Sequence, residues 1–307
     1  MEVGIVGLPG SGKTTLFTAL TGGGAHAGGG RPNVGMAPIE DPRLEQVASV
    51  IGSPKATQAA VRVLDTAGTS AAQLGTLRRA DALLAVLDGF SAGADTASDL
   101  TSLELELVVA DRDHVERRLE RVRKEAKSGE AALKEEVGRL EAALELLEEG
   151  RPLRDLPGEL PAELEPLTTK PLVVVENGPG GIDAKLEAEL AELAPEDAQE
   201  FREGPSALNE VVRRLFEALD LIVFFTANEN EARAWTLRRG QTALEAAASV
   251  HTDMAHGFVR CEVIRWNELV ECGSRAEAAR RGVQRLEGKA YVVEDGDVLN
   301  IRFTPAR

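Results

Sequence analysis

The chain opens with MEVGIVGLPGSGKTTLFTALT, residues 1–21, and this stretch decides its fold. Residues 2–6 form a short apolar run with β-branched members, which predicts a buried strand. Residues 14–21 show helical spacing, and residues 7–14 (GLPGSGKT) satisfy the pattern G-x-x-x-x-G-K-[ST]. A strand before this pattern and a helix after it are the context that a phosphate-binding P-loop requires, so a mere glycine-rich turn is the weaker interpretation.

The residue types of this motif indicate the chemistry of a nucleoside triphosphate. Glycines let backbone N–H groups close on phosphates at the positive end of a helix. Lys13, the predicted catalytic residue, is expected to place its ammonium against the β- and γ-phosphates. The Thr14 hydroxyl is expected to bind Mg²⁺, which keeps waters and phosphate oxygens and so needs few protein ligands. The predicted nucleotide-binding residues here are Pro9, Gly10, Ser11, Gly12, Lys13, Thr14 and Thr15.

Three further candidates follow predicted strands. Asp65 ends the run VRVLD and is predicted to help hold Mg²⁺, while the backbone of Gly68 is predicted to approach the γ-phosphate. Asn177 follows PLVVVE, where a side-chain amide reads the base in GTPase-like domains; the alternative is an asparagine that starts a loop. Residues 178–181 are Gly-Pro-Gly-Gly, so no acidic partner follows and no N/T-K-x-D motif selects guanine.

The rest of the chain predicts an α/β protein with two additions. Strands expected at 60–64 and 82–87, with a helix near 74–79, indicate a parallel sheet. Two heptad-spaced helices meet at Ser128-Gly129 and predict an antiparallel coiled-coil hairpin. The polar, glycine-rich stretch at 22–35 is expected to be a loop. After residue 219, strands that include the run AYVV at 290–293, together with a helix at 242–250, fit a β-grasp-like module. The predicted domains are 1–102 with 171–218 (P-loop G domain), 103–150 (hairpin insertion), 151–170 (Pro-rich linker) and 219–307 (β-grasp-like).

Composition and charge limit the compartment, the metal sites and the partners that the sequence predicts. No run approaches the ~18 apolar residues of a membrane span, and the two cysteines and four histidines show no metal spacing, so a cytoplasmic monomer is expected. The net charge of −16 argues against non-specific nucleic-acid binding. Residues 232–307, however, carry 12 Lys/Arg against 10 Asp/Glu, and RNA is a possible partner there. The candidate phosphate contacts, with surface ion pairs as their alternative, are Arg233, Arg238, Arg239, Arg280, Arg281 and Arg285.

These motifs resemble the YchF-type proteins of the Obg-related P-loop NTPases over most of the chain. Residues 4–22 are similar to the family's GIVGLPNVGKSTLFNALT, and residues 33–48 (NVGMAPIEDPRLEQVA) to its NVGVVPVPDPRLDxLA. Residues 233–266 and 286–303 resemble its C-terminal TGS-type module. The resemblance implies a Ras-like G domain, a coiled-coil insertion and a TGS domain. It also implies binding of ATP at least as well as GTP, slow hydrolysis with Mg²⁺, and a link to ribosomes.

The chain departs from the family pattern around the predicted phosphate site. Gly28-Gly29-Gly30-Arg31 stands where the family has a switch I threonine, and Thr69 to Leu77 is a shortened switch II. Ala85 replaces a histidine, and the strand and base-contacting loop expected beyond Asn177 are missing from the sequence. Three hypotheses follow: a slow NTPase with a ribosomal or RNA partner, a module that binds nucleotide without turnover and acts through the hairpin and TGS-like parts, or a scaffold with a dead pocket. We prefer nucleotide binding with weak hydrolysis.

Overall fold

The computed structural model describes residues 1–23, 33–66, 68, 70–128, 130–193, 195–201 and 206–304. These residues form two compact units, one of Met1–Ala37 with Arg62–Val211 and one of Pro38–Val61 with Val212–Arg307. Strands β2 (Asn33–Ile39) and β4 (Ala59–Asp65) carry the chain from one unit to the other. None of the described helices is long and apolar enough to cross a membrane.

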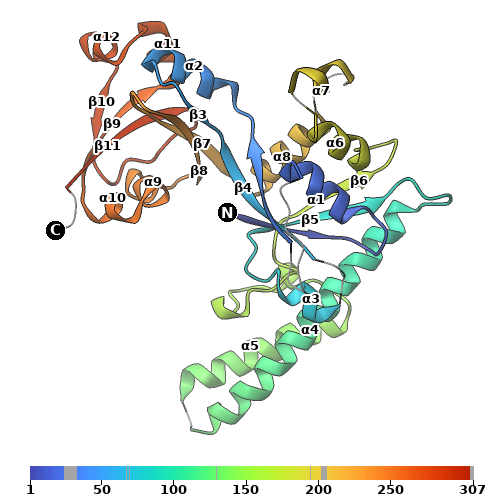
Figure 1. Ribbon diagram of the computed structural model, residues 1–307. Coiled ribbons are helices and arrows are strands. Elements are labelled where there is room, and N and C mark those ends of the chain that lie inside the picture. Colours follow the sequence, from blue (N-terminus) through green and yellow to red (C-terminus); the bar gives the residue numbers. More distant parts are fainter. Residues whose placement is uncertain are drawn as a thin grey trace. The chain divides into compact units, whose positions relative to one another are not determined.

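The first unit is built on a five-stranded sheet in the order β2-β4-β1-β5-β6 (Figure 1). Strand β1 pairs in parallel with β4 on one side and β5 on the other, and β5 pairs in parallel with β6. The remaining elements of this sheet and its helices are β1 (Glu2–Val6), α1 (Lys13–Thr21), α3 (Ala71–Gly75), β5 (Ala82–Asp88), β6 (Leu172–Asn177), α6 (Ala184–Ala191) and α7 (Pro195–Phe201). Helix α8 (Ala207–Ala218) then leads into the second unit. The expected parallel α/β sheet is confirmed.

The helical hairpin is inserted between β5 and β6. Helix α4 (Thr96–Glu125) and helix α5 (Ala131–Glu148) are joined through η1 (Ala126–Ser128) and lie side by side (Figure 1). Their apolar heptad positions form one cluster, in which Val115, Leu119 and Leu140 are almost fully buried. Helix α4 begins seven residues before the predicted start of the insertion, and its first half packs through Leu103 and Leu107 against the sheet.

The proline-rich segment after the hairpin is packed, not a free linker. Its 3₁₀ turns η2 (Leu153–Asp155) and η3 (Ala162–Leu164) bury Leu153 and Leu164 in the hairpin cluster. Asp111 of α4 fastens the end of this segment, because it accepts hydrogen bonds from the Leu167 N–H (3.0 Å) and from the Thr168 N–H and hydroxyl (both 2.8 Å).

Asp111 also receives a buried ion pair. The Arg78 guanidinium donates to Asp111 at 2.6 Å and to the Ala110 carbonyl at 2.9 Å, and the Asp111 side chain is 1% exposed. The pair ties the loop after α3 to the hairpin and to the segment that leads into β6. A buried carboxylate of this kind persists only because all its neighbours satisfy it.

We therefore expect Asp111→Ala to lower the free energy of unfolding by about 3–5 kcal/mol, since it leaves the Arg78 charge buried without its partner. Urea denaturation followed by circular dichroism measures this. Asp113→Ala is the control on the same helix; its ion pair with Arg112 is partly exposed, so its loss costs less than about 1 kcal/mol. Equal costs for the two variants would contradict the prediction.

The second unit contains a six-stranded sheet in the order β10-β9-β11-β7-β8-β3. The β7–β8 and β9–β11 pairs are antiparallel, whereas β11 and β7 are parallel. Its elements are α2 (Pro42–Ile51), β3 (Ala56–Thr57), β7 (Leu221–Ala227), β8 (Ala232–Arg238), α9 (Ala243–Val250), α10 (Thr252–His256), β9 (Phe258–Arg265), α11 (Trp266–Cys272), α12 (Arg275–Arg280), β10 (Arg285–Glu287) and β11 (Asp297–Phe303). The mixed sheet around α9 agrees with the predicted order of strands and helix.

Helices cover both faces of this sheet. Successive residues of a strand point to opposite faces. On β7, Phe224 packs in the cluster that includes Ala243 and Ala246 of α9. Phe225 lies under the guanidinium of Arg43 from α2, 5.6 Å from the ring centre. Arg43 also pairs with Asp295 before β11. Residues 38–61, predicted as part of the G domain, thus group with the C-terminal unit.

Several local predictions differ from the structure. Residues 22–35 were expected to be a loop, but β2 begins at Asn33, while residues 24–32 lie outside the described part of the chain. The run AYVV at 290–293 makes only an isolated bridge between Val292 and Thr242, not a strand. The short helices α10 and α11 and strand β10 carry too few residues for a periodic signal, and the sequence did not predict them.

The two cysteines differ in environment: one is a buried strand residue and the other a more accessible thiol. Cys261 on β9 is fully buried, and burial raises the pKa of its thiol to about 12. Cys272 at the end of α11 is partly exposed.

We expect iodoacetamide at pH 8 to alkylate Cys272 in the folded protein and to spare Cys261, because only the thiolate reacts and Cys261 stays protonated. Mass spectrometry of tryptic peptides measures the labelling. Both cysteines should react after unfolding in urea, which controls for peptide recovery. Early labelling of Cys261 in the folded protein would contradict the burial.

Candidate nucleotide-binding site

The loop between β1 and α1 adopts a backbone that only glycine tolerates well. Gly10 and Gly12 have φ values of 87° and 90°, in the left-handed region. Gly12 stands at the N-cap of α1, where no side chain caps the helix, and the first turn holds no acidic residue. The first N–H groups of a helix lack intrahelical partners. This helix end is therefore suited to an anion, which would take the place of the missing cap.

Lys13 lies inside the loop. Its side chain folds back so that Nζ donates to the carbonyls of Gly7 (2.8 Å) and Leu8 (2.9 Å). Only 8% of the residue is exposed. Burial lowers the pKa of Lys13, and the charges of Asp65 and Glu106 partly oppose this. The ammonium is thus held beside the glycine turn by neutral carbonyls, which an anion of higher charge density could replace.

Asp65 brings together residues from three elements. At the end of β4 it accepts a hydrogen bond from the Thr14 hydroxyl of α1 at 2.9 Å and one from the Asn33 amide of β2 at 3.0 Å, both on Oδ2. The residue is 1% exposed. The structure therefore joins Thr14 and Asp65, which the sequence predicted to share a metal ion. Asn33 was not predicted, although it lies in the quoted run at 33–48.

The same cluster suits a hard divalent cation. The second oxygen of Asp65, Oδ1, is buried and has no hydrogen-bond partner among the described residues. A buried carboxylate oxygen without a partner is costly, and a water bound to a cation would satisfy it. Hydroxyl and carboxylate oxygens are the ligands that Mg²⁺ prefers. Among the described residues, no three His, Cys, Asp or Glu side chains lie together so that they could hold a metal ion, so Thr14 and Asp65 would supply the protein's share of an otherwise water- and phosphate-ligated ion.

Asn177 braces the loop from β6. Its Nδ2 donates to the Ser11 carbonyl at 3.0 Å, and its Oδ1 accepts the N–H of Ala184, the first residue of α6, at 3.1 Å. A Cβ on Gly12 would meet Asn177 Nδ2 at 2.2 Å. The amide expected to read a base is therefore already bonded through both of its polar atoms. Neither the base-reading role nor the loop-starting alternative predicted this brace.

Helix α4 contributes a charge that the sequence did not indicate. Glu106 has one carboxylate oxygen, Oε2, that is buried and has no hydrogen-bond partner among the described residues, and its charge opposes in part the lowering of the Lys13 pKa by burial. The hairpin is thus electrostatically coupled to the P-loop lysine. A lone Glu in a helix rich in acids carries no signal of this kind in a sequence. Within the loop itself, Ser11 Oγ is also buried and has no hydrogen-bond partner in the part of the chain that the structure describes.

The remaining predicted residues line the loop or its approach. Pro9 and Gly10 are exposed at its outer turn, and Thr15 is half-buried in the first turn of α1. The Gly68 carbonyl accepts a hydrogen bond from the Thr66 hydroxyl at 3.2 Å. Thr69, named among the departures from the family pattern, lies outside the described part of the chain.

The sheet ends at β6 on the side where a base would be read. Between Asn177 and Leu221 the described residues form helices α6, α7 and α8 and no further strand. This agrees with the expected loss of the strand and base-contacting loop beyond Asn177. A short turn follows Asn177, and within it the Gly178 N–H donates a hydrogen bond to the Ile182 carbonyl.

Comparison with known proteins shows the family to which the chain belongs. Residues 2–128 match the MMR_HSR1 family model, described as 50S ribosome-binding GTPase, and residues 221–304 match YchF-GTPase_C, described as a protein of unknown function (DUF933). The chain is 33% identical to "Ribosome-binding ATPase YchF" of Bacillus subtilis over 99% of both chains. It is 34% identical to the protein of that name from Escherichia coli O157:H7, over 98% of this chain and 99% of the other. The chain belongs to the YchF family.

Solved structures support the same placement. The YchF GTPase of Schizosaccharomyces pombe has a TM-score of 0.81 and 25% identity, and the match covers 98% of this chain and 97% of that one. A GTP binding protein from Pyrococcus horikoshii, at 19% identity and a TM-score of 0.59, shares the fold. The alignment with the Bacillus YchF spans 362 positions against 307 residues here, so this member of the YchF family is a shortened one.

Most of the six C-terminal arginines already have partners. Arg280 and Arg281 both pair with Glu277, and Arg239 pairs with Asp220. Arg285 donates to the Tyr291 hydroxyl at 3.0 Å. Arg233 stacks over Trp235 at 4.5 Å. Arg285 also pairs with Glu287 and Asp297, so ion pairs, the alternative to phosphate contacts, account for four of the six arginines.

We expect Asn177→Ala to weaken ATP and GTP binding by the same factor, about tenfold, because it removes the brace on Ser11 and Gly12 and no contact to the base. Titration with fluorescent analogues of both nucleotides measures this. Asn228→Ala, which removes a loop-capping amide in the second unit, should leave both affinities unchanged. A loss confined to one nucleotide would show that Asn177 reads the base.

Proposed function

We propose that this YchF-family protein binds Mg-ATP or Mg-GTP at its P-loop, hydrolyses it slowly and acts on translation through the ribosome. The observation that carries the proposal is the joint arrangement of Lys13 and Thr14. Lys13 is buried within the glycine turn, and Thr14 is hydrogen-bonded to Asp65 across the sheet at 2.9 Å. The two groups that a polyphosphate and its cation need are thus held within one turn of helix α1.

The residues divide the work of binding and catalysis. The backbone N–H groups at Gly12, Lys13 and Thr14 would bind phosphate oxygens at the start of α1. Lys13 would exchange the Gly7 and Leu8 carbonyls for phosphate oxygens and neutralise charge that develops on phosphoryl transfer. Thr14 and Asp65 would hold Mg²⁺, which supplies further charge neutralisation when bound. Glu106 keeps a negative charge near Lys13 and so favours its protonated form.

A module that binds nucleotide without turnover is the second candidate. The glycines at 28–30 offer no hydroxyl in place of the family's switch I threonine, and the segment from Thr69 to Leu77 is short. Phosphoryl transfer depends mostly on positioning and charge neutralisation, so loss of a closing switch would slow the chemistry before it abolished binding. This candidate would act through the hairpin and the TGS-like second unit.

The ribosome is proposed as partner because the Bacillus and Escherichia relatives are named ribosome-binding ATPases. The milder charge balance of residues 232–307 supports a contact through the second unit. Arg233 is the best placed of the six arginines, since its guanidinium stacks on Trp235 and forms no ion pair in the described part of the chain, although its charge helps to lower the pKa of Glu231. A location in the cytoplasm follows from this partner.

Lys13→Ala is expected to lower the turnover of Mg-ATP and Mg-GTP by about 10²–10³-fold, the usual cost of removing one group that stabilises transition-state charge. Phosphate release measures turnover, and the nucleotide-induced thermal shift measures binding. Lys185→Ala is the control, an exposed lysine of the same unit.

The outcomes separate the candidates. Turnover lost only in Lys13→Ala supports the NTPase. Nucleotide binding by the unaltered protein without any release of phosphate supports the binding module. A thermal midpoint that neither nucleotide moves, in the unaltered protein, would refute the proposed function.

A further inference from the structure

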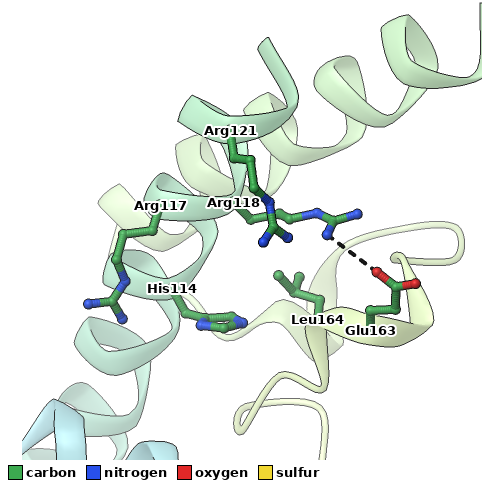
Figure 2. A pocket seen from close by; sticks show the side chains of 6 residues that line it. All are labelled: His114, Arg117, Arg118, Arg121, Glu163 and Leu164. Carbon is green, nitrogen blue, oxygen red and sulfur yellow. Dashed lines mark ion pairs between the residues drawn. The ribbon is translucent and has the colours of Figure 1, made fainter. Parts of the chain in front are cut away.

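A second site of positive charge lies on the hairpin, away from the P-loop. A cavity of about 380 Å³ opens between α4 and the 3₁₀ turn η3 (Figure 2). Its lining residues are His114, Arg117, Arg118, Arg121, Glu163 and Leu164. Three guanidinium groups and an imidazole thus surround one carboxylate, although the first 231 residues of the chain carry a large excess of acids.

Of the three arginines that line the cavity, only Arg118 pairs with acids among the described residues, with Glu136 at 2.7 Å and Glu163 at 3.3 Å. Arg117 and Arg121, four residues apart on α4, are exposed and have no acidic partner among the described residues. Like charges at this spacing repel each other along a helix. An anion seated between them would remove that repulsion.

The lining and the volume of the cavity suit a small polar ligand. Leu164, 2% exposed, forms an apolar floor. Figure 2 shows His114 and Arg121 pointing from α4 toward Leu164 and Arg118 reaching toward Glu163, while Arg117, at the edge of the cavity, points away from Leu164. The volume is at the lower end of the range for small-molecule sites. Glu163 is itself 79% exposed, so it does not close the cavity to an anion.

The chemistry of the lining favours a phosphate group. A guanidinium presents planar, paired N–H donors that match phosphate oxygens, and these contacts are stronger than neutral hydrogen bonds. His114 adds a donor at neutral pH without a further charge, because burial first and then the charges of Arg78 and Arg117 lower the pKa of its imidazole.

We propose that the cavity between α4 and η3 is a second phosphate-binding site, which takes a phosphate group presented either by a free polyphosphate or by an RNA backbone. Arg121 would contact the phosphate oxygens, with Arg118 and His114 as further donors, and Arg117 would turn inward from the edge of the cavity to add a second unpaired charge. The site shares no residue with the P-loop, so it does not rest on nucleotide hydrolysis.

The test compares two double variants of equal charge change. Arg117→Glu/Arg121→Glu reverses the two cavity arginines, and Lys124→Glu/Lys127→Glu reverses two exposed lysines farther along the same hairpin. Inorganic pyrophosphate is titrated by calorimetry in a Lys13→Ala background, so that the P-loop does not contribute. A labelled 12-residue single-stranded RNA is titrated by fluorescence anisotropy over a range of salt concentrations.

We expect the arginine variant to weaken binding at least tenfold, because two charge-assisted contacts are lost, and the lysine variant to weaken it far less. In the RNA arm, the slope of log K against log salt should fall by about 0.7 for each phosphate contact removed. Binding of pyrophosphate alone identifies a free phosphate ligand, and binding of RNA identifies the backbone. The neutral variant Arg117→Gln/Arg121→Gln should show the same loss in a milder form.

A second measurement, the NMR titration of His114, shows whether the ligand binds in the cavity. Pyrophosphate bound in the cavity should raise the pKa of His114, followed by NMR of the imidazole in the Lys13→Ala protein and assigned with His114→Gln. The proposal fails if neither ligand binds, if the arginine and lysine variants bind alike, or if the ligand that binds leaves the His114 titration unchanged. Circular dichroism and thermal midpoints establish that each variant is folded.

Discussion

The site depends on one contact, the Asn177 amide pressed against the left-handed turn at Gly12. The N–H groups of α1 can face an anion only because Gly12 takes a φ of 90°, and no side chain fits there, since a Cβ would lie 2.2 Å from Asn177. The amide holds the Ser11 carbonyl on one side and the start of α6 on the other. The turn is thereby fixed to β6, at the carboxyl end of the sheet where ligands of open α/β folds bind.

A buried carboxylate, that of Asp111, fixes the hairpin to the first unit as the Asn177 amide fixes the loop. Asp111 joins α4, the loop after α3 through Arg78, and the segment that enters β6 through Thr168. The hairpin is consequently part of the first unit's core and not a free arm. Because Glu106 lies on the same helix, a movement of α4 would change the electrostatic environment of Lys13. The same helix carries the arginine-lined cavity, so α4 contributes to both proposed phosphate sites.

The departures from the family pattern fall on the parts that close over a nucleotide. The loop, Lys13, Thr14 and Asp65 remain in place, while the sheet ends at β6 and α6 follows directly. Phosphate recognition needs only backbone, an ammonium and a cation, and these are local to β1, α1 and β4. Base recognition needs loops from farther along the chain, and in the described residues no strand follows β6 before the second unit.

The sequence alone determined the P-loop, the parallel sheet around it and the helical hairpin, because each rests on a local pattern: a glycine spacing between strand and helix, short apolar runs, and a heptad repeat. It also predicted that Thr14 and Asp65 act together. Only the tertiary structure decided the partners of Asn177, the place of Asn33 and Glu106 beside the site, and the membership of residues 38–61 in the second unit. These depend on contacts between segments far apart in the chain, such as Asn177 with Ser11, and no periodicity or spacing encodes them. The arginines of α4 give another example. The sequence shows only a charged helix face, and the cavity exists because η3 packs against that face.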